Sequence, residues 1–157
     1  MLSAGDLAPA FTLSDLDGAK HSLGALLENG PVLLVIYKIS CPVCQLTMPF
    51  LERLHAAAMP GSLQFIAISQ DEDRSTQKFI ERYRTTMLTL LDREEDGYPV
   101  SNAFGITHVP SLFLIEMDGM ISRAVSGFSK SDIEEIGERV NVVPFQGSDH
   151  VPAWKAG

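Results

Sequence analysis

Residues 32–44 read VLLVIYKISCPVC, and this stretch decides the fold. Its first six residues are β-branched, aliphatic or aromatic, which predicts a strand covered on both faces at the centre of a sheet. Apolar residues then recur at steps of three and four, which predicts a helix over residues 42–58. Pro42 suits the first helical turn, where a missing N–H costs nothing. The stretch predicts a strand, a short loop and a helix, with Cys41 at the helix N-terminus.

The rest of the chain alternates between the same two patterns, and this alternation predicts an α/β fold. Pro49 lies inside the first long helix and predicts a kink there, because proline removes an interior hydrogen bond. The other expected elements are a β-ribbon over residues 11–23 with a turn at Asp17-Gly18, strands at 63–69 and 87–91, a helix capped by Asp73 and running to Arg84, a short helix near 98–104, strands at 111–117 and 120–126 joined by Asp118-Gly119, and a helix from Ser129 to Val140 with a capping box.

The length of 157 residues favours one domain with its own core. We expect residues 1–157 to form this single domain, with its core at about residues 5–140. Residues 141–157 contain two prolines and Trp154 but no periodic pattern. They form either a strap over the domain or a loose tail.

The composition excludes several function classes. A net charge of -8, from 20 Asp and Glu against 12 Lys and Arg, disfavours binding to phosphate backbones and to anionic lipid. We therefore expect neither nucleic acid nor a membrane surface as partner. The N-terminus lacks a basic and an apolar signal region, and no apolar run of about 18 residues predicts a membrane span. A cytoplasmic location is the expectation, and a periplasmic or exported location is the alternative if a signal has been removed.

The two cysteines, Cys41 and Cys44, form one site or none. At a helix N-terminus, unpaired N–H groups and the helix dipole favour the thiolate of Cys41, which is the nucleophile in disulfide exchange. Cys44 follows one turn later and can attack a mixed disulfide on Cys41, which releases the substrate. The redox-active pair needs no separate cofactor. Lys38 could add positive potential, although a solvated lysine is the simpler interpretation.

Two other interpretations of the cysteine pair stay open. Structural zinc needs four ligands, and beyond the pair the chain offers only scattered histidines, namely His21, His55, His108 and His150. We predict no metal. The pair could also be two inert buried thiols, but its place at a strand-to-helix junction, with a proline between the cysteines, is typical of redox motifs.

A second signal lies at Val109-Pro110, directly before a strong strand. Proline at the start of a strand needs a reason. A cis Val109-Pro110 bond would let the Val109 backbone pair with an extended substrate beside the sulfurs, but the trans form is commoner for X-Pro bonds in general.

Four landmarks in this order resemble the thioredoxin superfamily: the CPVC motif after an apolar strand, Pro49 five residues beyond Cys44, Val109-Pro110 before a hairpin, and Gly127 near Ser129-Lys130. The opening at residues 5–13, GDLAPAFTL, is similar to the redoxin branch, which TlpA-like thiol-disulfide oxidoreductases share with peroxiredoxins. The resemblance covers about residues 5–140. It implies a three-layer α/β/α fold with a central mixed sheet and an N-terminal β-hairpin extension.

The resemblance also implies a function and a site. Cys41 would be the attacking cysteine, Cys44 the resolving one and Pro110 a cis-proline facing them, with Pro42, Val43 and Val109 supporting the substrate. The partners would be a disulfide-containing protein and a thiol reductant that recycles the site. The chain departs from the family at Ser40, where tryptophan is usual, and at Val35, the position of the buried acid of thioredoxin.

Three other functions remain as alternatives. A thiol peroxidase would use Cys41 on peroxide, but Lys38 stands where that class has a hydroxyl and Ser111 where it commonly has arginine. A Sco-like copper protein would need cysteines spaced by three residues, with His108 as a third ligand. A non-catalytic binding module would hold a partner in a groove near Val43, Val109 and Phe128. Val43 and Val109 would make the rim around the sulfurs apolar.

Overall fold

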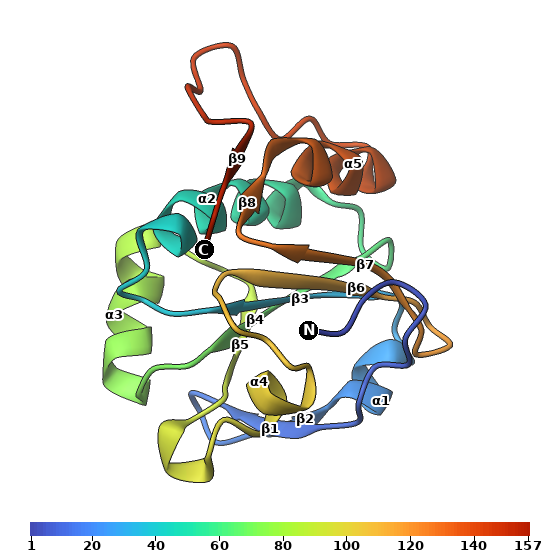
Figure 1. Ribbon diagram of the computed structural model, residues 1–157, viewed down its shortest axis with the longest axis vertical. Helices are drawn as coiled ribbons and strands as arrows, with labels where there is room; N and C mark the ends of the chain where they lie inside the picture. The colour runs from blue at the N-terminus through green and yellow to red at the C-terminus, as the bar shows by residue number, and fades with distance from the viewer.

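The computed structural model describes all 157 residues, and its centre is a mixed sheet of seven strands in the order β2-β1-β5-β4-β3-β6-β7 (Figure 1). β3 lies inside this sheet, parallel to β4 and antiparallel to β6, and each of its residues is at most 1% exposed. The strands are β1 Thr12–Asp15, β2 Lys20–Ser22, β3 Val32–Tyr37, β4 Gln64–Ser69, β5 Leu88–Leu91, β6 Ser111–Ile115 and β7 Ile121–Ser126.

Helices cover both faces of the sheet (Figure 1). One apolar cluster packs α2, α3 and α5 against one face, and a second packs α1 and α4 against the other. This arrangement confirms the expected three-layer fold with its central mixed sheet. The helices are α1 Leu23–Leu27, α2 Pro42–Ala57, α3 Asp73–Tyr83, α4 Pro99–Ala103 and α5 Lys130–Val140, with one turn of 3-10 helix, η1, at Glu94–Asp96.

The N-terminal hairpin is confirmed and is joined to the main sheet. β1 pairs with β2 and also runs antiparallel to β5. The carboxylate of Asp15 accepts hydrogen bonds from the N–H groups of Asp17 and Ala19, and Gly18 takes a φ of 84°, which glycine adopts without steric cost. The turn at Asp17-Gly18 therefore forms as predicted.

The structure differs from the expected elements at one helix cap, one additional helix and one strand end. Asp73 does not cap α3: the N-cap is Glu72, and Asp73 is the first helical residue, where its carboxylate pairs with Arg93 instead. α1 was not expected, although Ser22 caps it by accepting the N–H of Ala25. β6 ends at Ile115 because the register shifts there, so the predicted strand to Met117 is too long.

Residues 141–157 form a strap, the first of the two arrangements considered. A second, two-stranded sheet pairs β8 (Phe128–Ser129) with β9 (Trp154–Lys155). Arg53 on α2 donates to the carbonyl of Pro144 at 2.6 Å and to the Asp149 carboxylate at 2.8 Å. The chain thus crosses α2 and returns to the edge of β8. Figure 1 shows the C-terminus close to the start of α2.

The helix that begins at the cysteine pair runs without interruption to Ala57, with Pro49 inside it. The kink expected at Pro49 stays a prediction. None of the helices combines the length and the apolar character that crossing a membrane requires.

Candidate active site

Cys41 is the N-cap residue of α2 and stands where β3 has led into a short loop. Its backbone is extended, with φ -81° and ψ 117°, and the N–H of Cys44 donates to its sulfur over 3.3 Å. The Cys41 side chain is half-buried, and both cysteines are free thiols. An anionic sulfur at this position gains from the helix N–H groups, as expected from the sequence.

Cys44 lies beneath Cys41 and is 0% exposed. Burial raises the pKa of the Cys44 thiol, because the thiolate would lose its hydration in the core, and the nearby Cys41 sulfur raises it further. Cys44 is therefore a protonated thiol at neutral pH. A protein substrate can reach Cys41 but cannot reach Cys44.

The Val109-Pro110 bond is cis, and the Val109 carbonyl meets the active sulfur. The Cys41 thiol donates to the Val109 oxygen over 3.4 Å, which joins two loops that are 68 positions apart in the sequence. Pro110 is buried and its carbonyl accepts the N–H of Gly127 at 2.8 Å, while Val109 is half-buried. Val109 thus belongs to the surface that a ligand at Cys41 can contact, together with Thr107 and His108 of the same loop.

Of the two valines expected at an apolar rim around the sulfurs, Val109 lines the hollow beside Cys41 and Val43 does not. Val43 is only 6% exposed and packs in the core beneath the helix, and Phe128 is 0% exposed. A groove formed by Val43, Val109 and Phe128 therefore does not exist, because two of its three side chains point into the core. Pro42 is exposed at the start of α2. Val35 is 0% exposed and places an apolar side chain at the position of thioredoxin's buried acid.

The space beside Cys41 is a hollow of about 360 Å³, and its lining surface is more apolar than polar. No side chain of aspartate, glutamate, lysine or arginine contributes to it. Its lining consists of Cys41, Gln70, Tyr98, Ser101, Asn102, Ile106, Thr107, His108, Val109 and Gly157. His108 therefore lies in the same hollow as Cys41, but no group of three or more His, Cys, Asp and Glu side chains is arranged to hold a metal ion.

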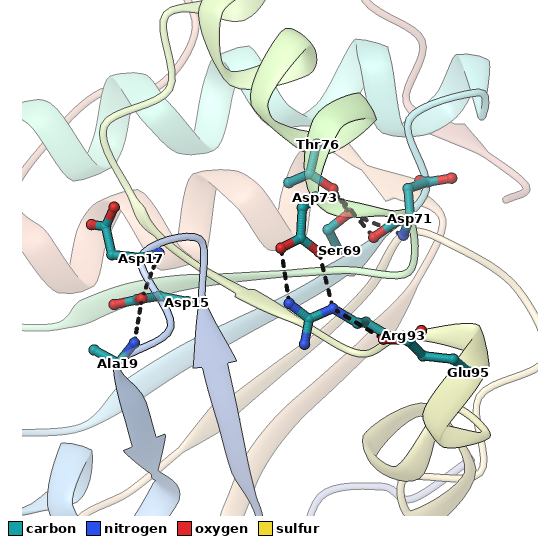
Figure 2. A network of polar contacts seen from close by, with 9 residues as sticks. All are labelled: Asp15, Asp17, Ala19, Ser69, Asp71, Asp73, Thr76, Arg93 and Glu95. Carbon is teal, nitrogen blue, oxygen red and sulfur yellow. Dashed lines mark hydrogen bonds and ion pairs between the residues drawn. The ribbon is translucent and has the colours of Figure 1, made fainter.

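A larger groove of about 780 Å³ adjoins this hollow and shares Gln70 and Tyr98 with it. Lys38 lines the groove and its side chain is exposed, as expected for a solvated lysine. On its opposite side Arg93 binds the Asp73 carboxylate through two nitrogens, at 3.0 and 2.9 Å (Figure 2).

Asp71 belongs to the site, although the sequence analysis did not predict it. Its carboxylate accepts the N–H of Ile39 at 2.7 Å, in the loop that leads to Cys41. Its own N–H donates to the Ser69 hydroxyl, which is hydrogen-bonded to Thr76 at 2.7 Å in the core (Figure 2). Asp71 thus fixes the loop that carries the reactive sulfur. The available signal was a carboxylate two residues after a buried strand, because such positions lie at the edge of the sheet where strands end.

Comparisons of the sequence with known proteins agree with a redox-active cysteine pair at this position. The sequence profile described as Redoxin matches residues 3–138. The chain belongs to the Redoxin family. The thiol-disulfide oxidoreductase ResA of Geobacillus thermodenitrificans is 30% identical over 136 residues, which cover 85% of this chain and 76% of ResA. ResA of Halalkalibacterium halodurans is 31% identical, covering 87% of this chain and 77% of the relative.

A solved structure supports the Redoxin fold independently. The thioredoxin domain of a thiol-disulfide oxidoreductase from Bacteroides vulgatus superposes with a TM-score of 0.77 at 24% identity, and covers 88% of this chain and 98% of its own. The ResA relatives show that the chain is a thiol-disulfide oxidoreductase. Cys41 and Cys44 are its cysteine pair.

Proposed function

We propose that this enzyme exchanges disulfides in protein substrates through a dithiol formed by Cys41 and Cys44. The observation that carries the proposal is the contrast between the two sulfurs. Cys41 is accessible and receives an N–H at the helix N-terminus, whereas Cys44 is fully buried within the same turn. One sulfur can attack a substrate, and the other is protected until that attack has occurred.

The exchange runs in two displacements. The Cys41 thiolate attacks one sulfur of the substrate disulfide, forms a mixed disulfide and displaces the other substrate sulfur as a thiolate, which takes up a proton. Cys44 then loses its proton and attacks the Cys41 sulfur, which displaces the second substrate thiolate. The substrate gains two electrons and two protons, and the enzyme is left with a Cys41–Cys44 disulfide. A thiol reductant returns the dithiol by the reverse steps.

Variants of the two cysteines test this mechanism. In Cys44→Ser the mixed disulfide on Cys41 cannot be resolved, so incubation with a disulfide-containing polypeptide should give a covalent adduct in intact-mass spectra without reductant. Cys41→Ser should give none, because Cys44 is buried. The adduct should disappear on addition of dithiothreitol.

Two results would overturn the proposal. One is adduct formation by Cys41→Ser at the rate seen with Cys44→Ser, which would assign the attack to the wrong sulfur. The other is rapid oxidation of Cys41 to a sulfenic acid by hydrogen peroxide, with no polypeptide captured. That outcome would favour the peroxidase alternative instead.

A further inference from the structure

Gln70 stands between the two hollows beside Cys41, and the mechanism above does not use it. It follows β4 directly, and its backbone N–H donates to the Tyr37 carbonyl at the end of β3. Its side chain is half-buried and lines both the 360 Å³ hollow and the 780 Å³ groove. Gln70 therefore lines the same hollow as Cys41, where a polypeptide that brings a sulfur to Cys41 would lie.

The orientation of the Gln70 amide is fixed by a buried carboxylate. Asp92 is 0% exposed and accepts hydrogen bonds from the N–H of Val100, the N–H of Ser101 and the Ser101 hydroxyl, the last at 2.6 Å. The single hydroxyl proton of Ser101 is therefore committed to Asp92. The Ser101 oxygen can only accept from Gln70, so the group that lies 2.9 Å from it must be the amide nitrogen Nε2.

The rest of this amide is left for a ligand. With Nε2 turned to Ser101, the amide plane sets the direction of Oε1, which accepts no hydrogen bond within the protein and is not buried. The second proton of Nε2 also has no partner within the protein. Gln70 therefore offers one acceptor and one donor in a fixed plane, the same pair of groups that a peptide backbone uses in a sheet.

The lining of the hollow indicates which ligand this pair suits. The lining of the hollow beside Cys41 includes no side chain of lysine, arginine, aspartate or glutamate. A small anionic thiol would find no cation there, and the net charge of -8 would repel it. An uncharged segment of extended polypeptide would instead find Gln70 and Val109 in the lining of the same hollow as Cys41.

We propose that Gln70 is a substrate-recognition residue, whose Oε1 accepts a backbone N–H of the polypeptide next to its reactive cysteine, with Ser101 and Asp92 as positioning residues. The inference rests on the proposed function and names the feature of the substrate that the site reads. Because the contact is made to the backbone, it favours polypeptide disulfides over small disulfides without selecting a side-chain sequence.

The experiment compares wild type and Gln70→Met on two substrates, an uncharged extended peptide joined by a disulfide to a reporter thiol, and dithiobis(nitrobenzoate). Methionine keeps the length of the side chain and removes both hydrogen-bonding groups. For the peptide, KM should rise about three- to tenfold at nearly constant kcat, as expected for one neutral hydrogen bond. For the small disulfide neither constant should change, and the midpoint of the cysteine pair should stay that of wild type.

N-methylation of the peptide identifies the contact itself. Methylation of the residue on one side of the cysteine should cost wild type the same factor of about three to ten, and should cost Gln70→Met nothing further. Ser101→Ala, which frees the amide to rotate, should show part of the KM effect on the peptide alone. Gln77→Met is the matched control, because Gln77 is exposed on α3 and bonds only to Glu81.

The outcomes separate the two proposals. Equal sensitivity of wild type and Gln70→Met to N-methylation at every position would overturn the role of Gln70 and leave the dithiol mechanism intact. An equal loss on both substrates would also overturn it, because it would mean that the substitution disturbs the chemistry. Failure of wild type to reduce either substrate would overturn the proposed function and, with it, this inference.

Discussion

Single residues divide the work at the site between reaction and support. Cys41 is accessible and Cys44 is buried, so their order of action follows from exposure alone. Asp71 supports them from the side, since its carboxylate holds the Ile39 N–H and its own backbone is tied to Ser69. A sulfur at a loop-to-helix junction keeps its position only if the loop keeps its conformation.

Asp71→Ala tests this support. The substitution leaves the Ile39 N–H without its acceptor, and we expect a loss of about 1–2 kcal/mol in unfolding free energy. Reduction of small and polypeptide disulfides should slow by the same factor, because the Cys41 loop itself shifts. Urea unfolding and assays on both substrates give the result. Asp71→Asn, which keeps an acceptor oxygen, should recover most of the loss.

Asp73→Ala is the control for that variant. Asp73 is two positions away, its side chain is 51% exposed, and it pairs with Arg93 at the surface. Exposed ion pairs contribute about 0–1 kcal/mol to the free energy of unfolding, so stability should change by no more than that. Activity should be unchanged, because the Asp73 side chain bonds to Arg93 and not to the loop that carries Cys41. If Asp71→Ala behaved like Asp73→Ala in both assays, Asp71 would have no special part in the site.

Among the elements, the strap joins the C-terminal residues to the reactive end of the molecule. It contacts α2 through Arg53, packs Phe145 against Phe50 with ring centroids 4.7 Å apart, and pairs β9 with β8. Gly137 allows α5 to lie against it, because a Cβ there would be 2.4 Å from the Val142 carbonyl oxygen. The strap is therefore packed as part of the core that carries α2.

Gly137→Ala should destabilise the protein by about 1–3 kcal/mol, because the added methyl group would displace the backbone at Val142. Gly24→Ala in α1 is the matched control. A Cβ at Gly24 meets nothing within 4 Å, so that variant should be neutral or gain about 0.5–1 kcal/mol. Denaturant unfolding of both variants, with Trp154 fluorescence as a local probe, gives the comparison. Equal stabilities would contradict the account of the strap.

The elements also show what the sequence alone could predict. The long elements β3, α2, β4 and α5 lie where the sequence predicts them. Burial on one or both faces requires apolar residues at regular spacing, and this spacing can be seen in the sequence. The strap was left undecided because its contacts are few and far apart in sequence. Arg53 donates a hydrogen bond to Asp149, which is 96 positions away, and no local sequence pattern predicts such a contact.

Some residues of the site could be predicted from the sequence and others could not. The cysteine pair and Val109-Pro110 were found from local motifs, and the structure brings Cys41 to the Val109 carbonyl. Gln70 and Asp71 were missed because their roles depend on partners in other elements. Val43 packs in the core on the same face of α2 as Phe50 and Leu54, as the helical spacing of apolar residues indicates, and it is therefore not available to a substrate.

For the molecule as a whole, two buried acids link stability to pH. Burial raises the pKa of the Cys44 thiol and of the Tyr37 hydroxyl, which has no hydrogen-bond partner. The folded protein therefore holds both protons more tightly than the unfolded chain. As pH rises, the unfolded chain loses them first, near pH about 8.5 for cysteine and about 10 for tyrosine, and the stability falls.

The reduced enzyme should accordingly lose unfolding free energy above pH about 8.5, at up to about 1.4 kcal/mol per pH unit for the Cys44 proton. Cys44→Ser lacks that proton and should have a flatter profile between pH about 8.5 and 10. Urea unfolding in the presence of a phosphine reductant measures both curves. Parallel curves would show that Cys44 does not titrate as a buried thiol.

The central claim is that Cys41 and Cys44 cycle between dithiol and disulfide. Equilibration in graded dithiothreitol and glutathione buffers, followed by thiol alkylation and intact-mass measurement, tests it directly. We expect a two-electron transition with one midpoint, in which both alkylation sites disappear together. Retention of two free thiols in every buffer, or oxidation of Cys41 alone, would contradict it.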